Sequence, residues 1–321
     1  MRNSCLALLL TGVMGLLPAA ASAQSYPQKP IRLIIPFPPG GIDIPGRLIS
    51  TKVGEALGQP LVLDYRSGAN GIIGCEIVAK ATPDGYTLLY STSNTQVLAI
   101  YTARSLPYDP VKDFTPIALA NEGGMFLAVH SSNPANSLKD LLEEAKRNPG
   151  KLSFASSGTG SFFQLMGEQI KMLAGLDMLH VPYKGTGPMQ QAVMSGEVTM
   201  YFGSGSVFPL VNAGKLKLLA YLEDKRSAFR PEVAPITDAL PGYQKISTWM
   251  GYFGPAAMPR PIVTRLNAEI VKALSTVELR GKLGEFGYAA IGNTPEQAAQ
   301  TIRTDVEVMG RIVKAAGIKP E

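Results

Sequence analysis

A loop rich in glycine and hydroxyl groups is the feature of this sequence best suited to bind a small anion. It reads Ser156-Ser157-Gly158-Thr159-Gly160-Ser161 and lies between an expected strand at residues 152–155 and an expected helix that starts at Phe162. Glycine lets a backbone approach a ligand closely, and the first amides and the dipole of a helix attract negative charge. The sequence therefore indicates a cradle for a carboxylate or a phosphate, with an ordinary glycine-serine connection as the alternative.

A second loop, in the N-terminal part of the chain, repeats this pattern. Residues 36–43, Pro-Phe-Pro-Pro-Gly-Gly-Ile-Asp, follow an expected strand at 31–35 and precede an expected helix. Gly40 and Gly41 free the backbone, and we expect Asp43 to cap the helix rather than to act as a catalytic acid. Two such helix starts that face each other would suit a ligand with an anionic group at one end or at both ends.

The residue combinations that common enzymes need are mostly missing. The only histidines are His130 and His180, and neither has a cysteine or carboxylate at metal-ligand spacing beside it. The sequence contains no G-x-S-x-G nucleophile elbow and no G-x-x-x-x-G-K-[ST] phosphate loop. Gly68, Gly71 and Gly74 lack the G-x-G opening of a dinucleotide-binding turn. We therefore expect no catalytic residues, no metal and no cofactor.

The N-terminus indicates export from the cytoplasm. Arg2 precedes an apolar run from Cys5 to Leu17, and Ala21-Ser22-Ala23 is a small-residue cleavage site. We predict a cleaved signal peptide at residues 1–23 and a free protein in the periplasm. The apolar run is too short for a permanent membrane-spanning helix.

The charge distribution and the cysteine content limit which binding partners and which disulfide bonds this protein can have. The formal net charge is +5, but the basic residues are scattered and form no run typical of a nucleic-acid or lipid-binding patch. We expect no nucleic-acid partner, and a monomer. Removal of residues 1–23 leaves Cys75 as a lone cysteine in an apolar run, so we expect a buried thiol and no intramolecular disulfide.

Strands and helices alternate along the rest of the chain, which predicts an α/β fold. Besides the strands already named, we expect strands at 60–63, 86–90, 125–130 and 178–181. We expect Ser137 to cap one helix, Gly58 to end another, and Thr294-Pro295-Glu296-Gln297 to form a capping box. Ligands of open α/β sheets lie beyond the carboxyl ends of strands, which points to the loops 36–43, 91–95, 156–161 and 183–188.

These loops and several other stretches resemble the substrate-binding proteins of tripartite tricarboxylate transporters, also called Bug proteins. The resemblance runs through almost the whole chain after residue 23, and its ordered set of short motifs is more specific than any one of them. The matching stretches are Tyr26-Pro27 to Pro30-Ile31, Pro36-Phe37 to Gly40-Gly41, Ala81 to Leu88, Leu106 to Pro110, Phe154 to Gly158, His180 to Gly185, Ala213 to Leu216 and Lys314 to Ile318.

The resemblance implies a two-lobed, type II periplasmic-binding-protein fold with a central ligand cleft and two strands that cross the hinge. It implies a first lobe of residues 24–124 plus 248–321 and a second lobe of residues 125–247. It also implies a carboxylate held by loops of both lobes, with ordered water, and delivery to the membrane subunits of a transporter. Closure about a hinge is the usual motion of such proteins.

This sequence departs from the family pattern at two places. Gln164 stands where many members have histidine, which keeps hydrogen bonding but removes a possible positive charge. Gly203-Ser204-Gly205-Ser206 stands where many members have an acidic or amide residue, which makes an amino-acid ligand less favourable. If two or three of the neighbouring aromatic residues line the cleft, an aromatic carboxylate such as a phthalate-type diacid becomes a candidate. Those residues are Phe162, Phe163, Tyr201, Phe202 and Trp249.

We therefore expect a periplasmic solute-binding protein for a small carboxylate, either an aromatic mono- or dicarboxylate such as terephthalate or an aliphatic di- or tricarboxylate. The alternatives are an extracytoplasmic sensor that presents the ligand to a receptor and, less favoured, a two-lobed enzyme. The expected ligand-binding residues are Phe37, Pro39, Gly40, Gly41, Ser91, Thr92, Ser93, Ser156, Ser157, Gly158, Thr159, Gly160, Ser161, Gln164, Tyr183, Gly203 and Ser204.

Overall fold

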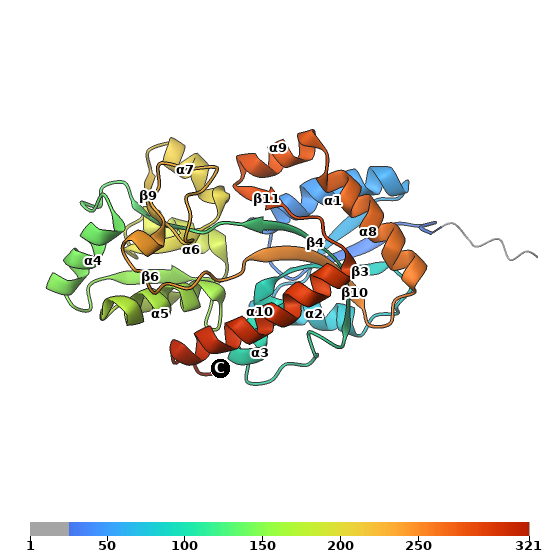
Figure 1. Ribbon diagram of the computed structural model, residues 1–321, viewed down its shortest axis with the longest axis horizontal. Helices are drawn as coiled ribbons and strands as arrows, with labels where there is room; N and C mark the ends of the chain where they lie inside the picture. The colour runs from blue at the N-terminus through green and yellow to red at the C-terminus, as the bar shows by residue number, and fades with distance from the viewer. Residues whose placement is uncertain (1–25, 321) are drawn as a thin grey trace, which may run out of the picture.

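The computed structural model describes residues 26–320 and contains two sheets, each with its own helices (Figure 1). The expected signal peptide at 1–23 lies outside the described residues. The first sheet has six strands in the order β11-β4-β10-β3-β1-β2. These strands are β1 (Ile31–Ile35), β2 (Leu61–Tyr65), β3 (Thr87–Thr92), β4 (Phe114–Gly123), β10 (Trp249–Pro255) and β11 (Tyr288–Ala290). β1 pairs in parallel with β2 and β3, whereas β10 runs antiparallel to β3 and β4.

The second sheet has five strands in the order β7-β6-β8-β5-β9. They are β5 (Phe126–His130), β6 (Ser153–Ser156), β7 (Leu179–Pro182), β8 (Met200–Gly203) and β9 (Leu216–Tyr221). β6 pairs in parallel with β7 and β8, and β5 pairs antiparallel with β8 and β9. The predicted α/β class and two-domain architecture are therefore confirmed.

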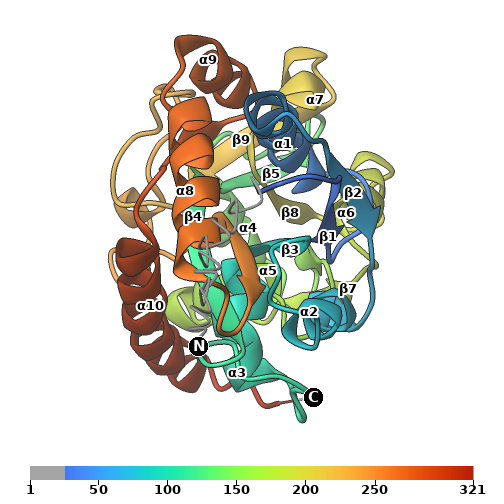
Figure 2. The ribbon, with the colours of Figure 1, turned by 90° about the vertical axis from the view of Figure 1, so that its right-hand side faces the viewer.

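Helices cover both sheets (Figure 2). Those of the first domain are α1 (Asp43–Leu57), α2 (Ile72–Ala79), α3 (Ala99–Thr102), α8 (Arg260–Leu274), α9 (Val277–Glu285) and α10 (Pro295–Ala315), with the short helical turns η1 (Ala69–Gly71) and η2 (Asn94–Leu98). Those of the second domain are α4 (Leu138–Arg147), α5 (Phe162–Ala174), α6 (Thr186–Met194) and α7 (Phe208–Asn212), with η3 (Gly205–Val207) and η4 (Ile236–Asp238).

Local sequence signals set several helix ends as predicted. Ser137 caps α4 by accepting a hydrogen bond from the amide of Asp140, and Thr294 and Gln297 form the reciprocal capping box of α10. Gly58 ends α1 in a left-handed conformation with φ 72°. Because each of these three helices also buries apolar residues in the core, the local signals and the core specify the same structure.

The chain passes between the two domains twice. β4 ends at Gly123 and β5 begins at Phe126, so only two residues separate a strand of one sheet from a strand of the other. The return passage leads into β10, and Figure 1 shows β4 and β10 running side by side between the domains. At the start of β10 the Trp249 indole donates a hydrogen bond of 2.6 Å to Asp305 of α10. The exact lobe limits of 24–124 plus 248–321 and 125–247 stay a prediction.

Two local expectations are wrong. Asp43 is the first residue of α1 and not its N-cap, and its carboxylate accepts a hydrogen bond of 2.6 Å from the Gly40 amide. Residues 91–95 are not an open polar loop, because β3 continues to Thr92 and η2 begins at Asn94, and all five residues are buried. Their polar groups are satisfied inside the protein, as between Ser93 and the Ser247 carbonyl at 2.6 Å. The expected burial of Cys75 is confirmed, and burial raises the pKa of its thiol.

Candidate functional site

A cavity of about 240 Å³, the inner cavity, lies between the two domains. The first domain lines it with the loop after β1, η1, the end of β3, the start of η2, β10 and β11. The second domain lines it with residues near β5, α5, α6 and β8. Its first-domain residues are Phe37, Pro38, Pro39, Gly40, Gly41, Ile42, Asn70, Thr92, Asn94, Met250 and Tyr288. Its second-domain residues are Met125, Ser157, Phe162, Phe163, Lys184, Gly185, Thr186, Gly187, Pro188, Gln190, Tyr201, Gly203, Ser204 and Ser206.

A second cavity of about 640 Å³, the outer cavity, adjoins the inner one. It extends along η1, the start of α2 and the end of α3 in the first domain, and along the loops after β6 and β7 in the second. The residues that line both cavities form the junction between them. They are Phe37, Pro38, Asn70, Ser157, Lys184 and Gly185.

Eleven of the seventeen predicted ligand-binding residues line one of these cavities. Those at the inner cavity are Phe37, Pro39, Gly40, Gly41, Thr92, Ser157, Gly203 and Ser204, and those only at the outer cavity are Gly158, Thr159 and Tyr183. The other six lie behind the cavity walls. They are Ser91, Ser93, Ser156, Gly160, Ser161 and Gln164, and their part in binding stays a prediction.

Internal hydrogen bonds explain why residues of the glycine-rich loop lie behind the wall. Ser161 Oγ caps α5 by accepting a hydrogen bond of 3.3 Å from the backbone amide of Gln164. The Gln164 side chain in turn accepts from the Gly160 amide at 2.8 Å. Gln164 therefore organises the loop, and the sequence pattern alone did not distinguish this role from ligand contact.

The two helix starts offer fewer free donors than we expected. The amide of Phe162, at the start of α5, donates to Asn94 Oδ1 of the other domain at 3.0 Å. The Gly40 amide is bound by Asp43, whose carboxylate also accepts from Arg47 at 3.1 Å. At each helix start, therefore, one donor that could have held a ligand is already bound to a protein oxygen.

One charged side chain, Lys184, lines the two cavities. It stands at the junction, in the loop between β7 and α6, and is exposed to solvent. Among residues 26–320, no aspartate or glutamate lines either cavity. A cation without an acidic neighbour at the wall attracts an anionic ligand and offers no partner for an ammonium group.

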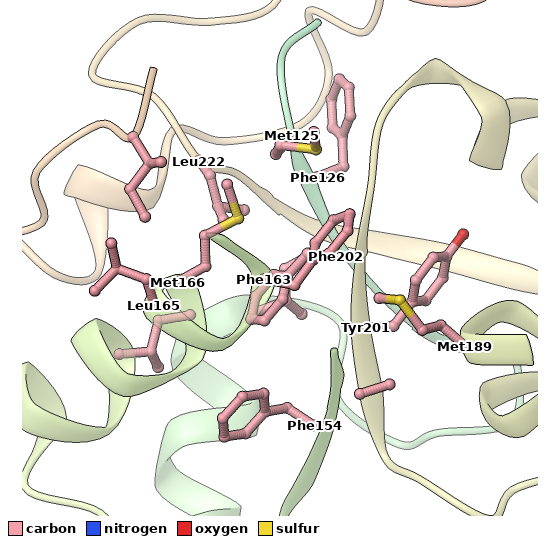
Figure 3. Close-up of a cluster of buried hydrophobic side chains, with 14 of the residues drawn as sticks. Met125, Phe126, Phe154, Phe163, Leu165, Met166, Met189, Tyr201, Phe202 and Leu222 are labelled. Atoms are coloured by element: carbon pink, nitrogen blue, oxygen red, sulfur yellow. The ribbon is translucent and has the colours of Figure 1, made fainter. Parts of the chain in front are cut away.

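Aromatic side chains form much of the wall of the inner cavity. Phe162, Phe163 and Tyr201 line the inner cavity, and the ring centroids of Phe162 and Phe163 lie 4.3 Å apart. Phe202 and Trp249 belong to the core and do not line it. Figure 3 shows the difference on β8, where the Phe202 ring points towards Phe163 and the Tyr201 ring lies on the opposite side, beside Met189. Adjacent residues of a strand face opposite sides.

Several lining residues had no signal in the sequence. Tyr288 reaches the cavity from β11, a strand of only three residues, and Met250 comes from the crossing strand β10. Asn94 was inside a predicted loop but was not selected, and Gln190 lies in a helix that we did not predict. Lys184 lies in a stretch that resembles the family, and its isolation from other charges is visible only in three dimensions.

The two domains touch each other beside both the inner and the outer cavity. Ser204 Oγ and the Tyr288 hydroxyl lie 3.0 Å apart, and the Tyr288 hydroxyl also donates to the Gly41 carbonyl at 3.4 Å. Thr102 Oγ1 donates to the Gly160 carbonyl at 3.1 Å. Contacts between the two domains therefore flank both cavities.

The arrangement that comes nearest to a nucleophile and a base is Ser156 and His180. Ser156 Oγ lies 2.6 Å from His180 Nε2, but it also donates to the Gly158 carbonyl at 3.0 Å. Ser156 is buried and does not line a cavity. Within residues 26–320 no group of three His, Cys, Asp or Glu side chains could hold a metal ion.

No helix within residues 26–320 is both long and apolar enough to span a lipid bilayer.

Comparisons with known proteins agree with this geometry. The family model for the tripartite tricarboxylate transporter family receptor matches residues 46–318. A protein from the tcbD–tcbE intergenic region of Pseudomonas sp. (strain P51) is 36% identical over 92% of this chain and 88% of its own length. Protein BugT of Bordetella pertussis is 30% identical over 94% of this chain and 93% of its own length.

Solved structures are similar throughout the chain. Rpa4515 of R. palustris with adipate has a TM-score of 0.89 and 32% identity, and covers 92% of this chain and 100% of that one. MatC of Rhodopseudomonas palustris with bound malate has a TM-score of 0.83 and 30% identity, and covers 90% and 100%. The periplasmic binding protein BugD has a TM-score of 0.85 and 27% identity, and covers 92% and 100%. This chain therefore belongs to the tripartite tricarboxylate transporter receptor family, a family of periplasmic solute-binding proteins that includes the Bug proteins.

Proposed function

We propose that this protein captures a small carboxylate in the periplasm by closing its two domains around it, and delivers the ligand to the membrane subunits of a tripartite transporter. The observation that carries the proposal is the inner cavity, which both domains line and whose one charged residue is Lys184. The likeness to structures with adipate and with malate supports the same ligand class.

The inner wall favours an apolar or aromatic body on this carboxylate. Phe37, Phe162 and Phe163 provide faces for ring stacking, and Met125 and Met250 provide adaptable apolar surface. A cavity of about 150 Å³ admits a benzene ring, so a cavity of about 240 Å³ has room for a ring with substituents. Because no acidic residue of the described part of the chain lines it, glutamate is a poor candidate.

A thermal-shift screen of the purified protein tests this proposal. Benzoate, terephthalate, protocatechuate, citrate, succinate and glutamate are compared at equal concentrations. A ligand present at about 100 times its dissociation constant adds roughly 2.7 kcal/mol to the free energy of unfolding, which is easily measured. We expect at least one ammonium-free carboxylate to raise the melting temperature. If only glutamate raised the melting temperature, our interpretation that the cavity wall offers no partner for an ammonium group would be wrong.

Recovery of the bound compound separates binding from catalysis. We expect the carboxylate to be recovered unchanged after denaturation, because Ser156 and His180, the pair that comes nearest to a nucleophile and a base, line neither cavity. Conversion of the compound during incubation would instead support an enzyme.

A further inference from the structure

The inner cavity has two chemically different ends. The junction end carries Lys184, Ser157 and Asn70 and opens into the outer cavity. The other end, the hinge end, is lined by residues that do not reach the outer cavity, among them Met125 beside β5 and Met250 on β10. Ser204 and Tyr288 belong to this end, because both lie against Gly123 at the end of β4, where the chain crosses between the domains. Its polar groups are uncharged. Those used below belong to Gln190, Tyr201, Ser204, Ser206 and Tyr288, and the other polar side chains that line the inner cavity alone are Thr92, Asn94 and Thr186.

Three hydroxyls at the hinge end form a chain whose direction is set by a carbonyl. The Tyr288 hydroxyl donates to the Gly41 carbonyl, so it accepts from Ser204, with which it shares a contact of 3.0 Å. Ser204 Oγ lies 3.5 Å from Ser206 Oγ, so Ser206 is left as the donor of that pair. Burial raises the pKa of Tyr288 to about 12, so its proton stays in place at neutral pH. The open end of the chain, the Ser206 oxygen, is therefore an acceptor.

Gln190 and Tyr201 give the hinge end one further acceptor and one donor. Gln190 Nε2 donates to the Tyr201 hydroxyl at 3.3 Å, which leaves Gln190 Oε1 free to accept and the Tyr201 proton free to donate. Burial raises the pKa of Tyr201, so this hydroxyl also stays neutral. Tyr201 is close to Gly203, since a Cβ on that glycine would lie 3.0 Å from its hydroxyl.

A group that both donates and accepts fits this end, and a carboxylate does not. A hydroxyl can donate to Ser206 or Gln190 while it accepts from Tyr201. A carboxylate can only accept, and at this end it would be buried without a cation beside it, which is costly. The junction end has the cation, and it is open to the solvent of the outer cavity.

We propose that the ligand is a monoanionic aromatic carboxylate. Its carboxylate lies at the junction end, beside Lys184, and a neutral hydroxyl at its opposite end forms hydrogen bonds with Ser206, Gln190 and Tyr201. This inference rests on the proposed function and deepens it. It favours hydroxybenzoate-type acids over the phthalate-type diacids that the sequence brought into consideration.

Isothermal titration calorimetry with three one-ring probes tests the ranking. We expect 4-hydroxybenzoate to bind more tightly than benzoate, and terephthalate to bind at least roughly tenfold more weakly than 4-hydroxybenzoate, because its second carboxylate would be buried without a partner. Terephthalate binding as tightly as 4-hydroxybenzoate would overturn the inference and leave the proposed function intact. Failure of every carboxylate of this set and of the thermal-shift screen to bind would overturn the proposed function itself.

A second cation at the hinge end should reverse the preference. Gln190→Lys puts an ammonium group on the inner wall, and we expect the affinity ratio of terephthalate to 4-hydroxybenzoate to rise roughly tenfold. Gln191→Lys is the matched control, since Gln191 is the exposed neighbour on α6 that lines neither cavity, and we expect its ratio to stay unchanged. An unchanged ratio in a folded Gln190→Lys protein would contradict the placement of the hydroxyl. The ranking by the unaltered protein decides the question if that variant does not fold.

The position of the carboxylate is tested separately. We expect Lys184→Gln to weaken all three probes by similar factors, whereas Lys151→Gln, at an exposed lysine away from both cavities, leaves their affinities unchanged. Selective weakening of terephthalate alone by Lys184→Gln would place the shared carboxylate elsewhere and so overturn the assignment.

Discussion

Ser204 and Tyr288, which lie in different sheets and are 84 residues apart in sequence, are joined by a hydrogen bond of 3.0 Å between their hydroxyls at the edge of the inner cavity. Ser204 follows β8 of the second sheet, and Tyr288 begins β11 of the first. The same tyrosine also donates to the Gly41 carbonyl, next to the start of α1. The pair therefore ties the loops of both domains together at a wall of the ligand cavity.

Tyr288→Phe should weaken this tie without opening a hole in the core. Loss of a buried hydrogen bond costs about 1 kcal/mol of the free energy of unfolding, and the ring itself remains. We expect that loss together with a larger radius of gyration of the ligand-free protein in small-angle X-ray scattering.

Tyr252→Phe is the matched control for this prediction. Tyr252 is equally buried and bonds to Ser50 at 2.9 Å, but both residues belong to the first domain. We expect a similar loss of stability and no change in the radius of gyration. If both variants increased the radius of gyration to the same extent, loss of the hydrogen bond between Ser204 and Tyr288 would not be the cause of the expansion.

Gly205→Ala should hinder domain closure by a clash of backbone with side chain. A Cβ at this position would lie 1.8 Å from the carbonyl oxygen of Phe286, so η3 would have to move away from the turn before β11. We expect lower ligand affinity in calorimetry, with a far-ultraviolet circular dichroism spectrum like that of the unaltered protein.

Gly281→Ala in α9 controls for the general effect of replacing glycine. A Cβ there meets no atom within 4 Å, and alanine is the better helix former by about 1 kcal/mol. We expect unchanged affinity and equal or higher stability. Unchanged affinity in Gly205→Ala as well would show that these two segments need not touch when ligand is bound.

Ser157→Glu should abolish carboxylate binding. Ser157 lines both cavities at the junction, so a glutamate there would fill the passage and place a negative charge beside Lys184. Repulsion of the ligand and neutralisation of the lysine act in the same direction. The measurement is the thermal shift produced by a carboxylate that stabilises the unaltered protein.

Ser131→Glu provides the comparison for this variant. Ser131 is exposed in the turn after β5 and lines neither cavity. We expect its thermal shift to equal that of the unaltered protein. Full binding by Ser157→Glu would remove the loop after β6 from the site.

Asp140→Asn should reduce the dependence of stability on acid pH. The backbone amide of Asn136 donates to Asp140 at 3.0 Å and, with the Ser137 cap, holds the pKa of this carboxyl below its usual range. A group whose pKa is lower in the folded state contributes stability above its unfolded pKa and loses it as the pH falls. We expect unfolding curves between about pH 6 and 3 to show a smaller loss for the variant.

Glu143→Gln, on the same helix, checks that this effect belongs to Asp140. The Glu143 side chain is exposed and makes no hydrogen bond or ion pair with any of residues 26–320. We expect this variant to keep the acid dependence of the unaltered protein. An equal change in both variants would assign the effect to net charge rather than to the helix cap.

The sequence was sufficient for the features that short-range physics controls. The capping box of α10, the glycine after α1 and the alternation of strands with helices follow from local backbone chemistry, and the family resemblance was confirmed by the comparisons. The glycine-rich loops were located correctly at strand ends. Their free donors were overestimated, because Asp43 and Asn94 bind amides that a sequence pattern leaves open.

The missed part of the candidate site depends on contacts between residues far apart in sequence. Tyr288 lines the cavity only because β11 pairs with β4, the strand that crosses to the other domain. The buried state of residues 91–95 likewise depends on partners such as Ser247, more than 150 residues away. Polar composition alone cannot distinguish such a buried, fully bonded segment from an exposed loop.

Trp249 gives this protein an intrinsic optical probe of its own hinge. It is the only tryptophan of the chain, it is 2% exposed, and it stands where the return passage between the domains enters β10. Its indole is fixed to Asp305, so its emission has a single origin and a defined environment. Ligand-induced movement of this passage would change that environment, and a fluorescence titration of the unlabelled protein would follow it directly.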